Sequence, residues 1–306
     1  MREISLEELL EAGCHFGHQV TRHNPKSRDF VFEARDNIHI IDLAKTREGL
    51  IEAANFVKNL AASNGTLIVV GTKRQARNII DEEIRRARSS LNSSLQNSSG
   101  QAGQAAEDAN LNLEPSLFYI TTRWIGGILT NFPEVSKNCK KLKEIASLLA
   151  NSEEKAKYTK KEIGLWEKQR AKLSGLYNGI LDMKKTPDAL FIIDTHLEDL
   201  AVREAAKTGV TTVGIVDTNA DPLLINYPIP ANDDAVGSIK LIVTYIIDAW
   251  IEGRKLAKNA KNRELAKDTK PEEKVKGSKT ISEESSKKVE KKSVKKRVTK
   301  SAKADK

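Results

Sequence analysis

Three cations follow an apolar stretch at a position where the chain could bind phosphate. Residues 67–71, LIVVG, form a short unbroken apolar run, which is typical of a strand buried on both faces of a sheet. Lys73, Arg74 and Arg77 come directly after this run, at the start of a predicted helix. Open α/β sheets bind ligands at the carboxyl ends of their strands, and helix amino termini attract anions. These cations therefore either bind phosphate or form the solvated side of an amphipathic helix.

A second set of residues could hold a divalent cation. Asp194 and Asp217 each end a predicted strand, and His18 could approach them. An imidazole and two carboxylates are ordinary ligands of divalent metal ions, so a structural cation held by His18, Asp194 and Asp217 is one hypothesis. The alternative is that each aspartate caps the turn that follows it. We expect no cofactor to be required beyond such an ion.

The motifs of common enzymes are missing from the sequence. The chain contains no GxGxxG, GxxxxGK[ST], GxSxG or HExxH, so the predicted sheet lacks the usual nucleotide-cradling turn. We therefore predict that the protein is not an enzyme. The alternative is an α/β enzyme or binding protein for a phosphorylated small molecule, which would use Asp194 and Asp217.

The positive charge is concentrated toward the C-terminal end. Residues 261–306 hold 17 Lys and Arg against 8 Asp and Glu, which accounts for the whole net charge of +9. RNA binding by the remaining residues must therefore depend on where their charges lie. The chain has no run of eighteen apolar residues, no signal-peptide core and only two cysteines, so we expect a cytoplasmic protein with no membrane partner.

The order of the predicted elements favours the α/β class. Apolar strands without strict alternation are expected at 67–71, 117–120, 189–193, 212–216 and 225–229, and helices separate most of them. We predict a doubly wound, mainly parallel, flavodoxin-like sheet. Ser5 and Glu8 form a capping box for a short N-terminal helix, and two short extended segments, 30–32 and 38–41, follow it.

Three segments depart from this pattern inside or after a predicted α/β domain of residues 1–255. Residues 89–115 are rich in Ser, Asn, Gln and Gly and predict a disordered insert. Residues 133–182 carry two apolar seams that step by three and four residues, which predicts a protruding antiparallel coiled-coil hairpin. Asn138 and Arg170 interrupt the seams, where they either fix register or lie near the open end. Residues 256–306 predict a disordered Lys-rich tail.

Several short motifs occur in an order that resembles one protein family. They are HFGHQ at 15–19, NPK at 24–26, IHIIDL at 38–43, GTKR at 71–74, RWIGG at 123–127, LTNF at 129–132, PDALF at 187–191, DTN at 217–219, DP at 221–222 and IPANDDA at 229–235. Together they resemble the bacterial-type small-subunit ribosomal protein two family, over about residues 3–255 except the insert.

The resemblance implies a noncatalytic, structural protein of the small ribosomal subunit in the cytoplasm. It implies a monomer within the ribosome that binds small-subunit ribosomal RNA, contacts neighbouring ribosomal proteins and helps to dock ribosomal protein one. Recognition is expected to read the shape of the RNA through phosphate contacts. The implied RNA contacts are Arg22, His23, Asn24, Lys26, Arg28, Arg35, Lys73, Arg74, Arg77, Arg123, Trp124, Thr130 and Asn131.

Three features depart from the family pattern. The insert lies where the family normally has a short connection. Thr21, Arg22 and His23 precede Asn24 and Pro25 where an aromatic residue is more usual, which argues against stacking at this position. The Lys-rich tail lies outside the resemblance and is either an arm that reaches RNA phosphates or a solubilising end. A cytoskeletal or adhesion adaptor that binds through the coiled coil is a third functional hypothesis.

Overall fold

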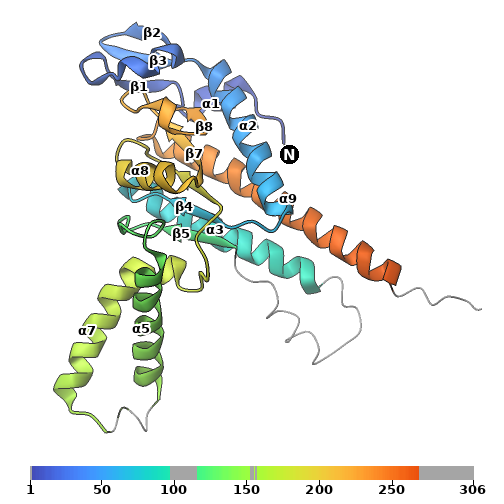
Figure 1. Ribbon diagram of the computed structural model, residues 1–306. Helices are drawn as coiled ribbons and strands as arrows, with labels where there is room; N and C mark the ends of the chain where they lie inside the picture. The colour runs from blue at the N-terminus through green and yellow to red at the C-terminus, as the bar shows by residue number, and fades with distance from the viewer. Residues whose placement is uncertain (1, 97–115, 152–154, 156, 269–306) are drawn as a thin grey trace, which may run out of the picture. The chain divides into compact units, whose positions relative to one another are not determined.

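Five parallel strands form the centre of the structure, a computed structural model that describes residues 2–96, 116–151, 155 and 157–268 (Figure 1). They are β4 (Leu67–Val70), β5 (Leu117–Ile120), β6 (Ala189–Ile192), β7 (Thr211–Val216) and β8 (Tyr227–Pro230). Their order in the sheet is β5-β4-β6-β7-β8, and every neighbouring pair is parallel. This order is that of flavodoxin-like doubly wound sheets. The predicted α/β class with a parallel sheet is confirmed.

The two faces of the sheet belong to two separate hydrophobic cores. Leu67 and Val69 of β4 lie in one core, whereas Ile68 and Val70 lie in the other. Side chains of successive strand residues point to opposite faces. Every position of β4 must therefore be apolar, which explains the unbroken run seen in the sequence.

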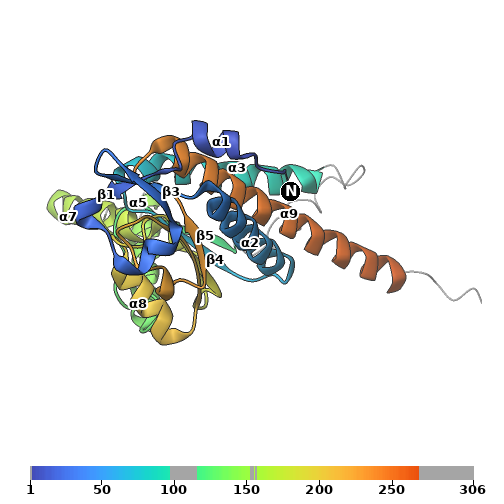
Figure 2. The same cartoon turned by 90° about the horizontal axis from the view of Figure 1, so that it is seen from above.

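Helices cover both faces. Residues of α1 (Leu6–Glu11), α2 (Leu43–Ala62), α3 (Arg74–Gln96) and α9 (Val236–Asp268) fill the first core, and residues of α8 (Asp199–Thr208) enter the second. Figures 1 and 2 show α2 and α9 on one side of the sheet and α8 on the other. Ser5 accepts a hydrogen bond from the Glu8 backbone amide and so caps α1 as predicted. No helix among the described residues has the length and apolar content to cross a bilayer.

A small antiparallel sheet lies beside the main one and has the order β1-β3-β2. It consists of β1 (Phe16–Gln19), β2 (Val31–Arg35) and β3 (Ile38–Ile41), with the short 3-10 helices η1 (Val20–Arg22) and η2 (Pro25–Phe30) between β1 and β2. Asp36 and Asn37 both have positive φ and form the turn between β2 and β3. The extended segment predicted at 38–41 is β3, and that predicted at 30–32 matches β2 except at Phe30, which ends η2. The sequence did not predict β1.

Two packed helices, α5 (Phe132–Ala150) and α7 (Lys160–Tyr177), form a helical hairpin between β5 and β6 (Figure 1). Thr159 and Glu162 make a capping box at the start of α7. The 3-10 turn η3 (Asn178–Ile180) then brings the chain back against β5. A Cβ added at Gly179 would lie 1.9 Å from the carbonyl oxygen of Tyr119, so only glycine allows this close approach.

Two segments predicted to be disordered begin with residues that are helical in the structure. Helix α3 runs to Gln96 because Ala87 and Leu91 continue its apolar face, so residues 89–96 are helical. Helix α9 runs to Asp268 because the first part of the expected tail is rich in good helix formers such as Ala, Lys, Glu and Leu. The compact α/β unit ends at Asn262 rather than at residue 255. The rest of both predicted segments, 97–115 and 269–306, lies outside the described residues.

Candidate functional site

Charged side chains gather where the parallel strands end. Lys73 follows β4, Asp194 follows β6, Asp217 follows β7, and Asp233 and Asp234 follow β8. Carboxyl ends of parallel strands meet at one edge of a sheet, and His18 of β1 joins them there. We call this group the carboxyl-edge cluster, and it consists of His18, Lys73, Asp194, Asp217, Asp233 and Asp234.

Lys73 lies inside this cluster and not on the open surface. Its Nζ is 2.8 Å from Asp233 Oδ1, 2.7 Å from Asp234 Oδ1 and 3.1 Å from Asp194 Oδ2. Burial alone would lower the pKa of Lys73, but the surrounding carboxylates outweigh it and raise the pKa above its ordinary value. The cation expected to contact phosphate is thus paired with three carboxylates of its own chain.

His18 connects the small sheet to the main one. Its Nδ1 is 3.1 Å from Asp217 Oδ2, and its backbone amide donates a hydrogen bond of 2.9 Å to Thr218 Oγ1. The interaction with Asp217 raises the pKa of the His18 imidazole despite partial burial. The Asn24 backbone amide also donates a hydrogen bond to the Thr218 carbonyl, which holds the segment after β1 at the same edge.

The structure changes the predicted metal ligands. His18, Asp217 and Asp233 each offer a ligand atom, and these atoms lie within 4.8 Å of one another. Asp194 instead faces Lys73 with one oxygen and accepts a hydrogen bond of 2.8 Å from the Leu197 amide with the other, as the capping alternative predicted. Asp194 is not among these three residues, so the described part of the structure groups His18 and Asp217 with Asp233 and not with Asp194.

The Asp233 carboxylate is buried, and one of its oxygens is not hydrogen-bonded to any described residue. Its side chain is 1% exposed, and its Oδ2 has no hydrogen-bond partner among the described residues. Burial and the negative charges of Asp194 and Asp217 raise the pKa of Asp233 to about 7. An imidazole with two buried carboxylates, one of them with an unsatisfied oxygen, fits a divalent cation.

Most of the predicted RNA-contact residues are exposed. The side chains of Arg22, Arg28, Arg35, Arg74, Arg77, Arg123, Thr130 and Asn131 all lie on the surface. Arg77 also donates a hydrogen bond of 2.9 Å to the Thr72 carbonyl. Since β4 and β5 are neighbours, Arg74 and Arg123 follow adjacent strands at the same edge.

The remaining predicted contacts have partners within the chain. Lys26 pairs with Asp221 at 2.5 Å, and the Asn24 side chain accepts a hydrogen bond from the Lys26 amide and so caps η2. Trp124 is 4% exposed and packs in the second core, so its ring is a core aromatic and not a surface platform for stacking.

A buried carboxylate that the sequence did not reveal holds the loop after β5. Glu204 of α8 accepts hydrogen bonds from the amides of Gly127 at 2.7 Å and Leu129 at 3.3 Å. Gly127 has a φ of +96°, which favours glycine. This contact positions the segment that carries Arg123, Thr130 and Asn131. A glutamate on the inward face of an amphipathic helix was the available sequence signal.

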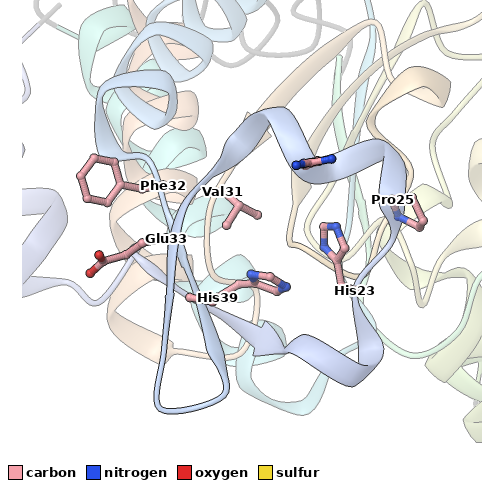
Figure 3. Close-up of a pocket in the computed structure, with 8 residues that line it drawn as sticks. His23, Pro25, Val31, Phe32, Glu33 and His39 are labelled. Atoms are coloured by element: carbon pink, nitrogen blue, oxygen red, sulfur yellow. The ribbon is translucent and has the colours of Figure 1, made fainter.

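A cavity of about 600 Å³ opens beside the small sheet (Figure 3). Its lining includes His23, Pro25, Arg28, Val31 and His39. The rings of His23 and His39 face each other at a centroid distance of 4.6 Å. Two predicted RNA-contact residues, His23 and Arg28, therefore belong to one concave site that the sequence did not predict.

Comparisons with known proteins agree with the resemblance seen in the sequence. Residues 9–93 and 101–253 match the family described as Ribosomal protein S2. The small ribosomal subunit protein uS2 of Fusobacterium nucleatum is 38% identical over 261 residues, which cover 85% of this chain and 94% of that relative. The protein of the same name from Geotalea uraniireducens is 42% identical over 261 residues, which cover 85% of this chain and 90% of that relative.

Proposed function

Because the chain belongs to the ribosomal protein S2 family, we propose that it is a structural component of the small ribosomal subunit. In this role it binds small-subunit ribosomal RNA during translation and subunit assembly. The carrying observation is that the family match spans the residues that build the sheet and both cores. The relatives are named as ribosomal proteins and not as enzymes, which decides against the enzyme hypothesis.

The exposed arginines at the carboxyl edge and on the small sheet are the proposed RNA contacts. Arg22, Arg28, Arg35, Arg74 and Arg123 make no ion pair with any described residue, so their guanidinium groups can reach phosphate oxygens. Arginine suits this role because its planar fork matches phosphate geometry. Thr130 and Asn131 lie on the same exposed loop as Arg123. Lys73 leaves this set, since its charge already serves the carboxyl-edge cluster.

We also propose contacts with neighbouring small-subunit proteins, among them ribosomal protein one, by a monomer within the cytoplasmic ribosome. Exposed leucines support a protein contact on this molecule. Leu197 and Leu200 are about half exposed at the start of α8, and Leu223 is 75% exposed in η4 (Pro222–Leu224). Exposed apolar side chains that cluster on a surface commonly mark interaction sites.

The hairpin is proposed to be an antiparallel coiled coil. Val135, Cys139, Leu142 and Ile145 of α5 are buried at spacings of four and three residues, as a seam requires. Asn138, one of the predicted polar breaks, donates a hydrogen bond of 3.2 Å to the Tyr177 hydroxyl near the base of the hairpin. Arg170, the other, is exposed and lies outside the seam.

We propose that His18, Asp217 and Asp233 bind a structural divalent cation. Such an ion would join β1 to the ends of β7 and β8 and would satisfy the unpaired oxygen of Asp233. It would also offset the repulsion among carboxylates that Lys73 offsets only in part. This ion has no catalytic role in the proposed function.

Sedimentation of the tagged full chain from cell lysate tests the ribosomal role. We expect co-migration with small subunits that is lost after ribonuclease treatment and weakened by high salt. The variant Arg74→Ala/Arg77→Ala should incorporate poorly. The control Lys137→Ala/Arg203→Ala, which also removes two exposed cations, should incorporate normally.

Protein that stays free of subunits and is insensitive to ribonuclease would contradict the proposal. That result would return attention to a phosphorylated small molecule as the ligand. Normal incorporation of the Arg74→Ala/Arg77→Ala variant would remove these two arginines from the RNA contacts and leave the ribosomal role intact.

A further inference from the structure

The cavity beside the small sheet contains a buried imidazole without partners. His39 is 9% exposed, and neither of its ring nitrogens has a hydrogen-bond partner among the described residues. Buried polar atoms are nearly always hydrogen-bonded, and leaving one unpaired costs free energy. Figure 3 shows His39, His23 and Val31 directed toward one another inside the cavity. An imidazole whose two ring nitrogens face an open cavity can hydrogen-bond a ligand that enters it.

The lining defines the chemistry of that ligand. Burial and the neighbouring His23 lower the pKa of His39, so its ring is neutral and offers one donor and one acceptor. His23 lies against it with an interplanar angle of 49° and holds its own Nδ1 3.5 Å from Ser27 Oγ. Val31 and Pro25 add apolar surface, and Arg28 brings a cation. Phe32 and Glu33 point away from His39 in Figure 3.

We propose that this cavity binds one unpaired RNA nucleotide, with its base against His23 and His39 and its phosphate on Arg28. The inference rests on the proposed RNA-binding function and adds a site at which a base, and not only the phosphate backbone, is held. The base of a nucleotide is flat and has hydrogen-bond donors and acceptors on one edge, and the attached sugar carries a phosphate anion. Unpaired bases of RNA are commonly splayed out and stacked on aromatic, histidine or arginine side chains. A volume of about 600 Å³ accommodates one nucleotide.

Arg28 is placed to supply the phosphate contact. It is exposed, lies in η2 next to the cavity and makes no ion pair with any described residue. Arg22 at the end of η1 and Arg35 at the end of β2 are also exposed and can contact the backbone of the flanking nucleotides. The proposed site thus consists of one pocket for a base and exposed arginines that contact the RNA on either side of that nucleotide.

Histidine NMR on the full chain tests this site without any mutation. The chain has five histidines, so each ring signal can be assigned and followed. Three probes are compared: a single-stranded hexaribonucleotide containing all four bases, a matched abasic hexamer and adenosine monophosphate. We expect the base-bearing hexamer to shift the His23 and His39 signals. The abasic hexamer should leave both unchanged, and exposed His196 should not respond to either.

Affinity measurements with a variant add a second arm. His39→Leu replaces the imidazole by an apolar side chain of similar volume and so removes both ring nitrogens. The variant should bind the base-bearing hexamer about tenfold more weakly than the wild type. Its affinity for the abasic hexamer should not change. Arg74→Ala, which removes a cation outside the cavity, should weaken both hexamers by the same factor.

Three results would overturn the proposal. His39 signals that do not respond to the base-bearing hexamer, or respond equally to the abasic one, would show that no base enters the cavity. Equal affinity for adenosine monophosphate and the hexamer would assign the cavity to free nucleotides. In each case co-sedimentation of the wild-type protein with small subunits would show that the ribosomal role itself stands.

Discussion

The carboxyl-edge cluster depends on a single lysine for its charge balance. Lys73 faces the carboxylates of Asp194, Asp233 and Asp234, and its side chain is only 16% exposed. Removing one member of a buried ion pair leaves charge without compensation, which costs more than the pair contributes. This residue therefore acts on the stability of the site and not on RNA directly.

We expect Lys73→Met to lower the free energy of unfolding by about 3 kcal/mol at pH 8 in the presence of a chelator. Asp233 has its pKa raised from 3.8 to about 7, so the folded protein takes up this proton at higher pH than the unfolded chain. Binding of this proton therefore raises the free energy of unfolding as the pH falls from 7 toward 4. This increase in stability is larger in the protein without Lys73.

Urea denaturation of both proteins at pH 8 and pH 5.5 measures the effect. The difference in the free energy of unfolding between Lys73→Met and the wild type should be smaller at pH 5.5, because protonation relieves the repulsion among the carboxylates. A difference that is constant or grows toward pH 5.5 would contradict the role assigned to Lys73.

The proposed metal ligands make a separate prediction at the residue scale. Titration of the full chain with Mn²⁺, followed by electron paramagnetic resonance, should show one site that weakens below pH 7, where protons compete for His18 and Asp233. His18→Ala and Asp217→Asn should abolish the site. Asp194→Asn is the matched control and should retain it, since Asp194 is outside the ligand set. Loss of binding in Asp194→Asn alone would restore the ligands predicted from sequence.

At the scale of elements, helix α8 fixes the loop that follows β5. Glu204 is 7% exposed and accepts hydrogen bonds from two amides of that loop. The loop has a positive φ at Gly127 and carries three proposed RNA contacts, and its position depends on a side chain from another element.

Glu204→Leu should lower the free energy of unfolding by about 2–3 kcal/mol, because it leaves the Gly127 and Leu129 amides without acceptors. Glu204→Gln keeps one acceptor and should lose about half as much. Hydrogen exchange gives the direct measurement: the two amides should exchange much faster in Glu204→Leu and only moderately faster in Glu204→Gln. Unchanged protection in the leucine variant would show that other contacts hold the loop.

At the scale of the whole molecule, charge is divided between a balanced folded unit and a basic C-terminal segment. Truncation after Asp268 removes 14 Lys and Arg with 6 Asp and Glu. We expect the melting temperature to stay the same and the dependence of RNA binding on salt to become shallower, because fewer counterions are released. A neutral Gly/Ser segment of equal length is the control for chain length. An unchanged salt dependence would identify the tail as a solubilising end.

Much of the fold could be predicted from local patterns. The apolar run at β4 predicted a strand buried on both faces, and the helical spacing after it predicted α3, since burial of a local element depends on its own side chains. The same patterns predicted the α/β class and the cap of α1. Helix ends were predicted less well, because Ser, Gln and Lys are compatible with helix and loop alike.

The partners of charged side chains were decided only by the tertiary structure. Lys73 and Asp233 are 160 residues apart in the chain and meet because β4 and β8 end at the same edge of one sheet. Residue type shows that a lysine can bind phosphate, but not that three carboxylates from two other loops surround it. The replacement of Asp194 by Asp233 among the proposed ligands, and the cavity around His39, have the same cause. Distances between side chains remote in sequence follow from strand order and loop conformation, which local patterns do not specify.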